Sequence, residues 1–110
     1  MAYDEELADR IRAEVAGERG VTEMKMFGGL AFLVGGNMAV AASGQGGLLV
    51  HVDKAAGEEL IRTTSARPME MRGREMKGWL RVDSGDVAGD AELSAWVERG
   101  LAYARSLPPK

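Results

Sequence analysis

The sequence from Met24 to Val40, MKMFGGLAFLVGGNMAV, contains two glycine pairs that are separated by five apolar residues. Glycines that bind phosphate precede a helix N-terminus, where free amide groups and the helix dipole attract an anion. Here the first pair, Gly28-Gly29, is followed by Leu-Ala-Phe-Leu-Val and then by a turn signal. The stretch therefore predicts the corners of a small β-sheet rather than a nucleotide-binding loop.

Short apolar runs, bounded by glycine or by polar turn residues, fill the middle of the chain. We expect three strands, over residues 21–34, 38–42 and 48–52, each paired with its sequence neighbour. Gly28-Gly29 falls inside the first of these strands, where such a pair marks a bulge or a sharp bend. Gly35-Gly36-Asn37 is a tight-turn signal, because Gly and Asn accept positive φ angles.

Apolar residues recur at three- and four-residue intervals in three other segments. They predict a helix over residues 4–17, a short helix over residues 54–63, and a long helix that starts at Asp90 and ends before Pro108-Pro109. The expected N-caps are Asp4, Asp53 and Asp90.

Two further strands are expected on either side of Gly73, which completes the element order α-β-β-β-α-β-β-α. Such an order places three helices on one face of a largely antiparallel, five-stranded sheet. The predicted fold class is therefore α+β, a two-layer sandwich.

The composition of the chain suits one domain over residues 1–110, with about 45% apolar residues. Cysteine is absent, which excludes disulfides and thiolate chemistry and suits a reducing cytoplasm. No apolar stretch is long enough for a membrane span, and the acidic N-terminus does not have the pattern of a secretory signal. We therefore expect a cytoplasmic protein that does not contact a membrane.

Residue types that carry chemistry are sparse. His51 is the one histidine, and it alternates with apolar neighbours in an expected strand. Gly73 and Gly78 have the separation of a phosphate-binding loop, but Trp79 and Leu80 follow where Lys and Ser or Thr are required. No serine lies in a nucleophile elbow, although carboxylates distant in the sequence could still meet in space. We predict no catalytic residue, no metal site and no cofactor, and hence a protein that is not an enzyme.

Charge is distributed unevenly along a chain of net charge −3. Residues 1–23 carry seven acids and three arginines, whereas residues 62–81 carry six basic residues and two glutamates. Such a basic segment is either a solvated strand face or a surface for an anion or an acidic partner.

The candidate interaction surface lies within this basic segment. It consists of Arg72, Arg74, Met76, Lys77 and Trp79. Cations beside Met and Trp are typical of an interaction hot spot or of a platform for single-stranded nucleic acid. The alternative is a strand with Trp79 inward and the basic side chains in water. We expect a protein partner or self-association, through this face or a sheet edge, ahead of nucleic acid, because the first helix is acidic.

Several segments, taken in order, resemble the N-terminal domain of the TfoX/Sxy family. They are MFGGLAFL at residues 26–33, GNMAV at 36–40, LLVHV at 48–52, MKGWLRVD at 76–83 and AWVERGLAYA at 95–104. The resemblance implies an α+β fold similar to type III secretion chaperones and a small stand-alone member of the family. Full-length relatives regulate bacterial competence together with a cyclic-AMP-dependent transcription activator. The resemblance thus implies a regulatory protein of a bacterium and transfers no catalytic motif. We expect such a module to act as a homodimer.

Overall fold

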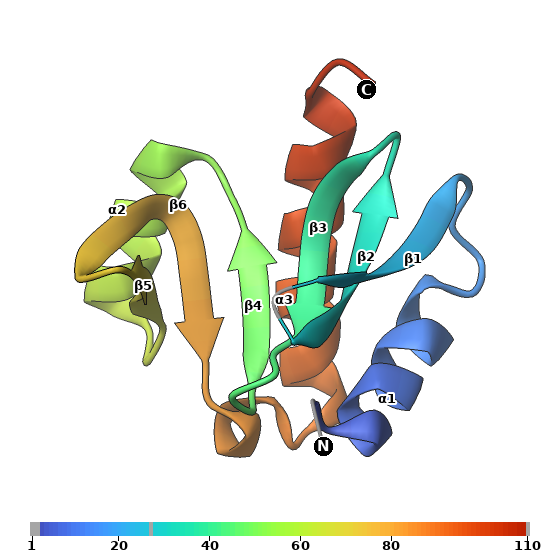
Figure 1. Cartoon of the computed structure of the whole chain (residues 1–110), viewed down its shortest axis with the longest axis horizontal. Helices are drawn as coiled ribbons and strands as arrows, with labels where there is room; N and C mark the ends of the chain where they lie inside the picture. The colour runs from blue at the N-terminus through green and yellow to red at the C-terminus, as the bar shows by residue number, and fades with distance from the viewer. Residues whose placement is uncertain (1–2, 27, 110) are drawn as a thin grey trace.

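A computed structural model describes residues 3–26 and 28–109, and within them it contains six strands, three α-helices and one 3-10 helix (Figure 1). Phe27, which the sequence analysis places in a strand, lies outside the described residues. The elements are α1 (Glu5–Val15), β1 (Val21–Met26), β2 (Gly29–Val34), β3 (Asn37–Ala42), β4 (Leu48–His51), α2 (Lys54–Thr63), β5 (Arg67–Met71), β6 (Arg74–Val82), η1 (Ser84–Val87) and α3 (Asp90–Ser106). None of the described helices has the length and apolar character needed to cross a bilayer.

All strands join one antiparallel sheet in the order β1-β2-β3-β4-β6-β5. The first four strands follow the sequence order, whereas β6 pairs with β4 and leaves β5 at the edge. Helix α3 packs across β3 and β4, α2 packs on β6, and α1 lies beside α3 and β3. The three α-helices therefore cover one face of the sheet, and β1 and β5 form its two edges (Figure 1).

The predicted α+β two-layer sandwich is confirmed, but the predicted count of five strands is wrong. Residues 21–34 form two strands, β1 and β2, which pair from Val21 with Val34 to Met26 with Gly29. Gly28 has a φ of 74° and lies where the chain reverses, so the first glycine pair makes a hairpin and not a bend within one strand. A Cβ at Gly29 would overlap the carbonyl oxygen of Ala42, so this second glycine permits the close approach of β3.

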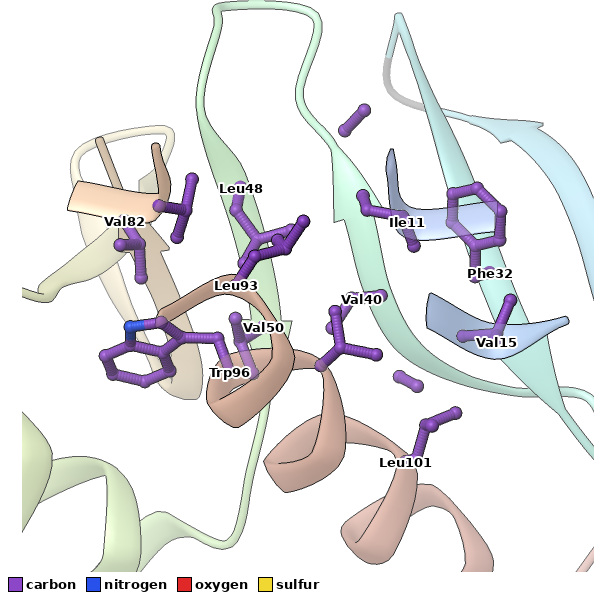
Figure 2. Packing of buried hydrophobic residues seen from close by; sticks show 14 of the residues in the cluster. Ile11, Val15, Phe32, Val40, Leu48, Val50, Val82, Leu93, Trp96 and Leu101 are labelled. Atoms are coloured by element: carbon purple, nitrogen blue, oxygen red, sulfur yellow. The ribbon is translucent and has the colours of Figure 1, made fainter. Parts of the chain in front are cut away.

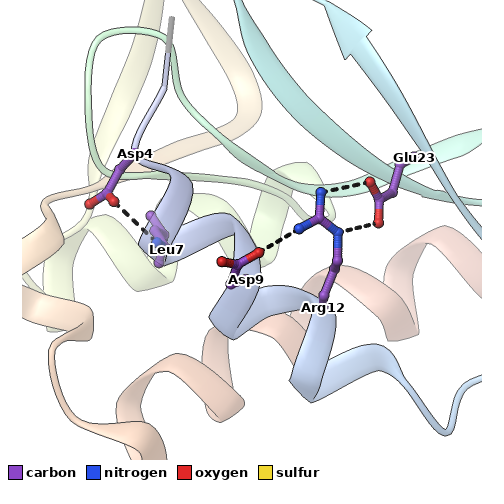
Figure 3. A network of polar contacts seen from close by, with 5 residues as sticks. All are labelled: Asp4, Leu7, Asp9, Arg12 and Glu23. Atoms are coloured by element: carbon purple, nitrogen blue, oxygen red, sulfur yellow. Dashed lines mark hydrogen bonds and ion pairs between the residues drawn. The ribbon is translucent and has the colours of Figure 1, made fainter. Parts of the chain in front are cut away.

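The expected helix caps are confirmed at two of the three helices. The Asp4 carboxylate accepts a hydrogen bond of 3.2 Å from the Leu7 amide (Figure 3), and the Asp53 carboxylate accepts from two amides at the start of α2. At α3 the prediction is wrong, because Gly89 is the N-cap and Asp90 is the first helical residue. The Asp90 carboxylate instead accepts a hydrogen bond of 3.2 Å from Arg10 of α1 and ties the two helices together.

The main core lies between the helices and alternate side chains of the central strands. Phe32 and Val40, neither with any exposed surface, belong to one cluster with Ile11 of α1 and with Leu93 and Leu101 of α3 (Figure 2). Each side chain of this size stabilises the fold by about 1.5–3 kcal/mol when it is buried. This core holds the sheet rigid and positions its two edges.

Helix α1 is joined to edge strand β1 by a polar network at the surface (Figure 3). The Arg12 guanidinium donates to both carboxylate oxygens of Glu23, at 2.7 and 3.0 Å, and to the Asp9 carboxylate at 2.6 Å. The hydrogen bond from Arg12 lowers the pKa of Glu23 below its ordinary value. The Glu23 carboxylate therefore binds a proton more weakly in the folded chain than in the unfolded chain. The ion pair with Arg12 stabilises the fold at pH values above the unfolded-state pKa of Glu23, and this stabilisation is lost as the pH falls through the folded-state pKa.

Glu23→Gln is therefore expected to lower the melting temperature slightly at neutral pH and to have a smaller effect at acidic pH, where Glu23 becomes protonated. The effect is small because surface ion pairs contribute little to stability. Thermal unfolding followed by circular dichroism at both pH values measures this difference. Glu98→Gln, at an exposed glutamate of α3 that forms no ion pair with the described residues, is the control. An equal decrease in melting temperature for both variants at neutral pH would contradict a stabilising ion pair between Arg12 and Glu23.

Candidate interaction surface on the last hairpin

The β5–β6 hairpin, which contains the five predicted surface residues, has an irregular register. Arg67 pairs with Arg81 and Pro68 with Leu80, but the next pair is Met69 with Met76. The residues from Lys77 to Trp79 are therefore extra on β6 and form a bulge. In a regular strand, Met76 and Trp79 would point to opposite faces. The bulge removes this alternation and brings both side chains to the same apolar cluster.

That cluster is a second, smaller core on the face of the sheet turned away from the helices. Its buried members are Ala31, Leu33, Met38, Ala41, Leu49 and Met69, and the partly buried Met26, Met76 and Trp79 pack against it. These residues come from all six strands, so the cluster extends across the sheet on this face. Met76 and Trp79 thus attach the hairpin to this second core. Trp79 points inward, as in the alternative of a strand with its basic side chains in water.

Trp79 is also covered from the side. The His51 imidazole stacks on the indole ring with 3.8 Å between ring centroids and 12° between planes. His51 in turn contacts Tyr103 of α3 edge-on at 4.9 Å, and its Nδ1 lies 3.3 Å from the carbonyl oxygen of Met38. His51 therefore contacts the hairpin, β3 and α3 at the same time, a role that its sequence pattern does not indicate.

The basic residues of the segment separate into two groups. Three of them bond within the molecule: Arg62 with Glu59, Arg67 with Asp83, and Arg81 with the Gly46 carbonyl and the Gln45 side chain. The other three, Arg72, Arg74 and Lys77, are exposed and form no ion pair with any residue that the structure describes. They lie at or near the tip of the hairpin, apart from the inward Met76 and Trp79.

Arg72 itself has an unusual backbone. It occupies the two-residue turn between Met71 and Arg74 with a φ of 56°, followed by Gly73 with a φ of 78°. This left-handed conformation at both turn residues suits Asn-Gly or Gly-Gly, and it costs a residue such as arginine about 1 kcal/mol or more. Strained residues of this kind cluster at functional sites. Arg72 is thus held at the tip with its charge free in water.

Among the hollows of the described surface, two have volumes above 400 Å³. One, of about 420 Å³, lies between α2 and α3 and has mainly apolar walls, which include Leu60, Ala102 and Tyr103. No sequence pattern indicates this hollow, because its walls come from helices far apart in the chain. The other, of about 430 Å³, is lined by Asp4 and Arg10, whose side chains bond to helix ends. Among the described residues, no group of three or more His, Asp or Glu could hold a metal ion.

The family model described as the TfoX N-terminal domain matches residues 13–104, which include every strand and α2 and most of α3. No curated protein matches the chain.

Proposed function

Because the chain belongs to the TfoX N-terminal domain family, we propose that it is a small regulatory module without catalytic activity. It acts in the cytoplasm by binding another protein through the tip of the β5–β6 hairpin, in the regulation of transcription or competence. The observation that carries this proposal is Arg72, an exposed arginine in a strained turn position that forms no ion pair with the described residues. A turn selected for stability alone would have Asn or Gly there.

The chemistry of the tip favours an acidic protein segment. Arg72 and Arg74 can each donate a pair of hydrogen bonds to a carboxylate, and Lys77 adds a third positive charge. Exposed arginines on a rigid support are common among residues that dominate binding energy. The second core holds the hairpin in place, so little conformational freedom is lost when a partner binds.

Nucleic acid is the second candidate, and the contacts favour it less. A platform for single-stranded nucleic acid needs an open aromatic face, whereas Trp79 is stacked on His51 and partly buried. Half of the six basic residues are bonded within the molecule, and Glu70 and Glu75 face each other within the hairpin. The positive potential of the three remaining cations, Arg72, Arg74 and Lys77, is therefore confined to the hairpin.

We expect Arg72→Glu combined with Arg74→Glu to abolish partner binding and leave the fold intact, because both side chains are exposed. The immobilised chain is incubated with nuclease-treated cell extract, and bound proteins are quantified by mass spectrometry. Proteins retained by the wild type and by the control Arg19→Glu with Lys54→Glu, but not by the hairpin variant, support the proposal. Identical sets of retained proteins would exclude this surface. Proteins that are retained only from a parallel extract without nuclease treatment would favour nucleic acid.

Arg72→Asn separates binding from folding in the same experiment. Asn-Gly is the preferred pair for this turn, so the variant should be more stable than the wild type by about 0.5–1 kcal/mol, since part of the backbone strain is relieved. It should nevertheless bind the partner more weakly, because the charge is gone. A variant that is more stable and binds equally well would show that Arg72 does not contact the partner.

A further inference from the structure

The two edges of the sheet differ in their capacity to accept another strand. At β5, Pro68 has no amide hydrogen to donate and Arg67 is held by Asp83, and proline is a common means of protecting an edge. At β1 the six residues from Val21 to Met26 contain no proline, and the register with β2 is regular. In an antiparallel ladder, alternate residues direct their N–H and C=O groups to opposite sides. Half of the β1 residues therefore present these groups to solvent.

The side chains of β1 are exposed along most of its length. Positions 22–25 are all exposed, and Met24, at 52% of its full surface, is the exposed large apolar side chain of the described part of the molecule. Methionine is flexible and adapts to varied surfaces, so it is common in binding patches. An exposed strand edge with a methionine at its centre is a site for strand pairing.

The charges of β1 identify the strand that fits. Glu23 and Lys25 flank Met24 symmetrically. If a second copy of β1 pairs antiparallel with Met24 opposite Met24, Glu23 lies opposite Lys25 of the second copy, and Lys25 lies opposite its Glu23. Opposite charges directly across a ladder stabilise pairing, whereas like charges oppose it. The strand is thus complementary to itself in this register.

We infer that this protein forms a two-fold symmetric dimer in which the β1 edges of two copies pair around Met24 and join the sheets into one. Both copies use the same surface, so the assembly closes as a dimer. This interface lies at the opposite edge from the β5–β6 hairpin, so the inference does not depend on the proposed partner surface. The dimer leaves both hairpin tips free and would present two of them to a partner.

The network on α1 favours this register (Figure 3). Arg12 holds Glu23 in place, and Asp9 shares the same guanidinium, so these three side chains carry a net charge of −1. Lys25 is exposed and forms no ion pair with the described residues. In the dimer, Lys25 of each copy would lie against this fixed acidic group of the other and neutralise it.

Charge reversal tests the register directly, with association measured by sedimentation velocity over a series of protein concentrations. Lys25→Glu replaces two attractive cross-strand pairs with two repulsive ones, and it should weaken dimerisation by about tenfold or more. Glu23→Lys should do the same. An equimolar mixture of the two variants restores both attractive pairs, and it should form heterodimers although neither variant dimerises well alone.

Two further variants keep this test falsifiable. Lys54→Glu makes the same charge change on α2, away from the edge, and should leave association unchanged. Met24→Glu places two like charges opposite each other on the symmetry axis without altering Arg12 or Glu23, and it should also give monomers. Circular dichroism verifies that each variant is folded. A monomeric wild type, or a Lys25→Glu variant that associates as the wild type does, would overturn the inference.

Discussion

Gly100→Ala is expected to destabilise the protein by about 2 kcal/mol, although alanine is the better helix former. Gly100 is buried in α3 where this helix crosses β3. A Cβ at this position would overlap the carbonyl oxygen of Ala39 and would lie 2.9 Å from the Cγ1 atom of Val40. The strand backbone cannot move away without breaking its ladder, so α3 must shift. A gain in helix propensity of up to about 1 kcal/mol does not offset this cost.

Gly57→Ala is the matched control for this prediction. Gly57 is also buried inside a helix, α2, but its nearest neighbour to a new Cβ would be the Val52 side chain at an ordinary 3.4 Å. The same substitution should therefore be neutral or stabilise the protein there. Thermal and urea unfolding of both variants measures the difference, and the melting temperature of Gly100→Ala should fall by roughly 10 °C. If the two variants changed stability in the same direction, the close contact of α3 with β3 would be refuted.

Trp79→Ala is expected to cost about 3 kcal/mol and to loosen the β5–β6 hairpin. The indole packs on the second core and stacks on His51, so truncation removes a large apolar contact and leaves a cavity. Because this contact anchors the bulge of β6, amide hydrogen exchange should accelerate in β5 and β6 more than in β2 and β3. Stability is measured by circular dichroism, and exchange by mass spectrometry.

Trp79→Phe distinguishes packing from a role at the surface. Phenylalanine keeps a flat ring against His51 and should cost only about 1 kcal/mol, with hairpin exchange near that of the wild type. A Trp79→Ala variant with unchanged stability and exchange would mean that the indole is not needed for packing. The indole would then be available to stack on the bases of a single-stranded nucleic acid.

Trp79 and its neighbours also show where prediction of the site from the sequence ends. Arg72, Arg74, Met76, Lys77 and Trp79 are close in the sequence and are predicted as one surface. In the fold, Met76 and Trp79 face the second core, and the cations project into water near the hairpin tip. The bulge that separates them depends on the register of β6 against both β4 and β5. Spacing within one strand does not contain that information.

The sequence alone determined the fold class, the three helices, the Asp4 and Asp53 caps and the turn at Gly35-Gly36, because these depend on residues within a few positions of one another. The tertiary structure decided the close approach of Gly29 to Ala42, the pairing of β6 with β4, and the stacking of His51 on Trp79. Each of these depends on the approach of segments distant in the chain. Such contacts form only when the whole core is assembled, so no local pattern specifies them.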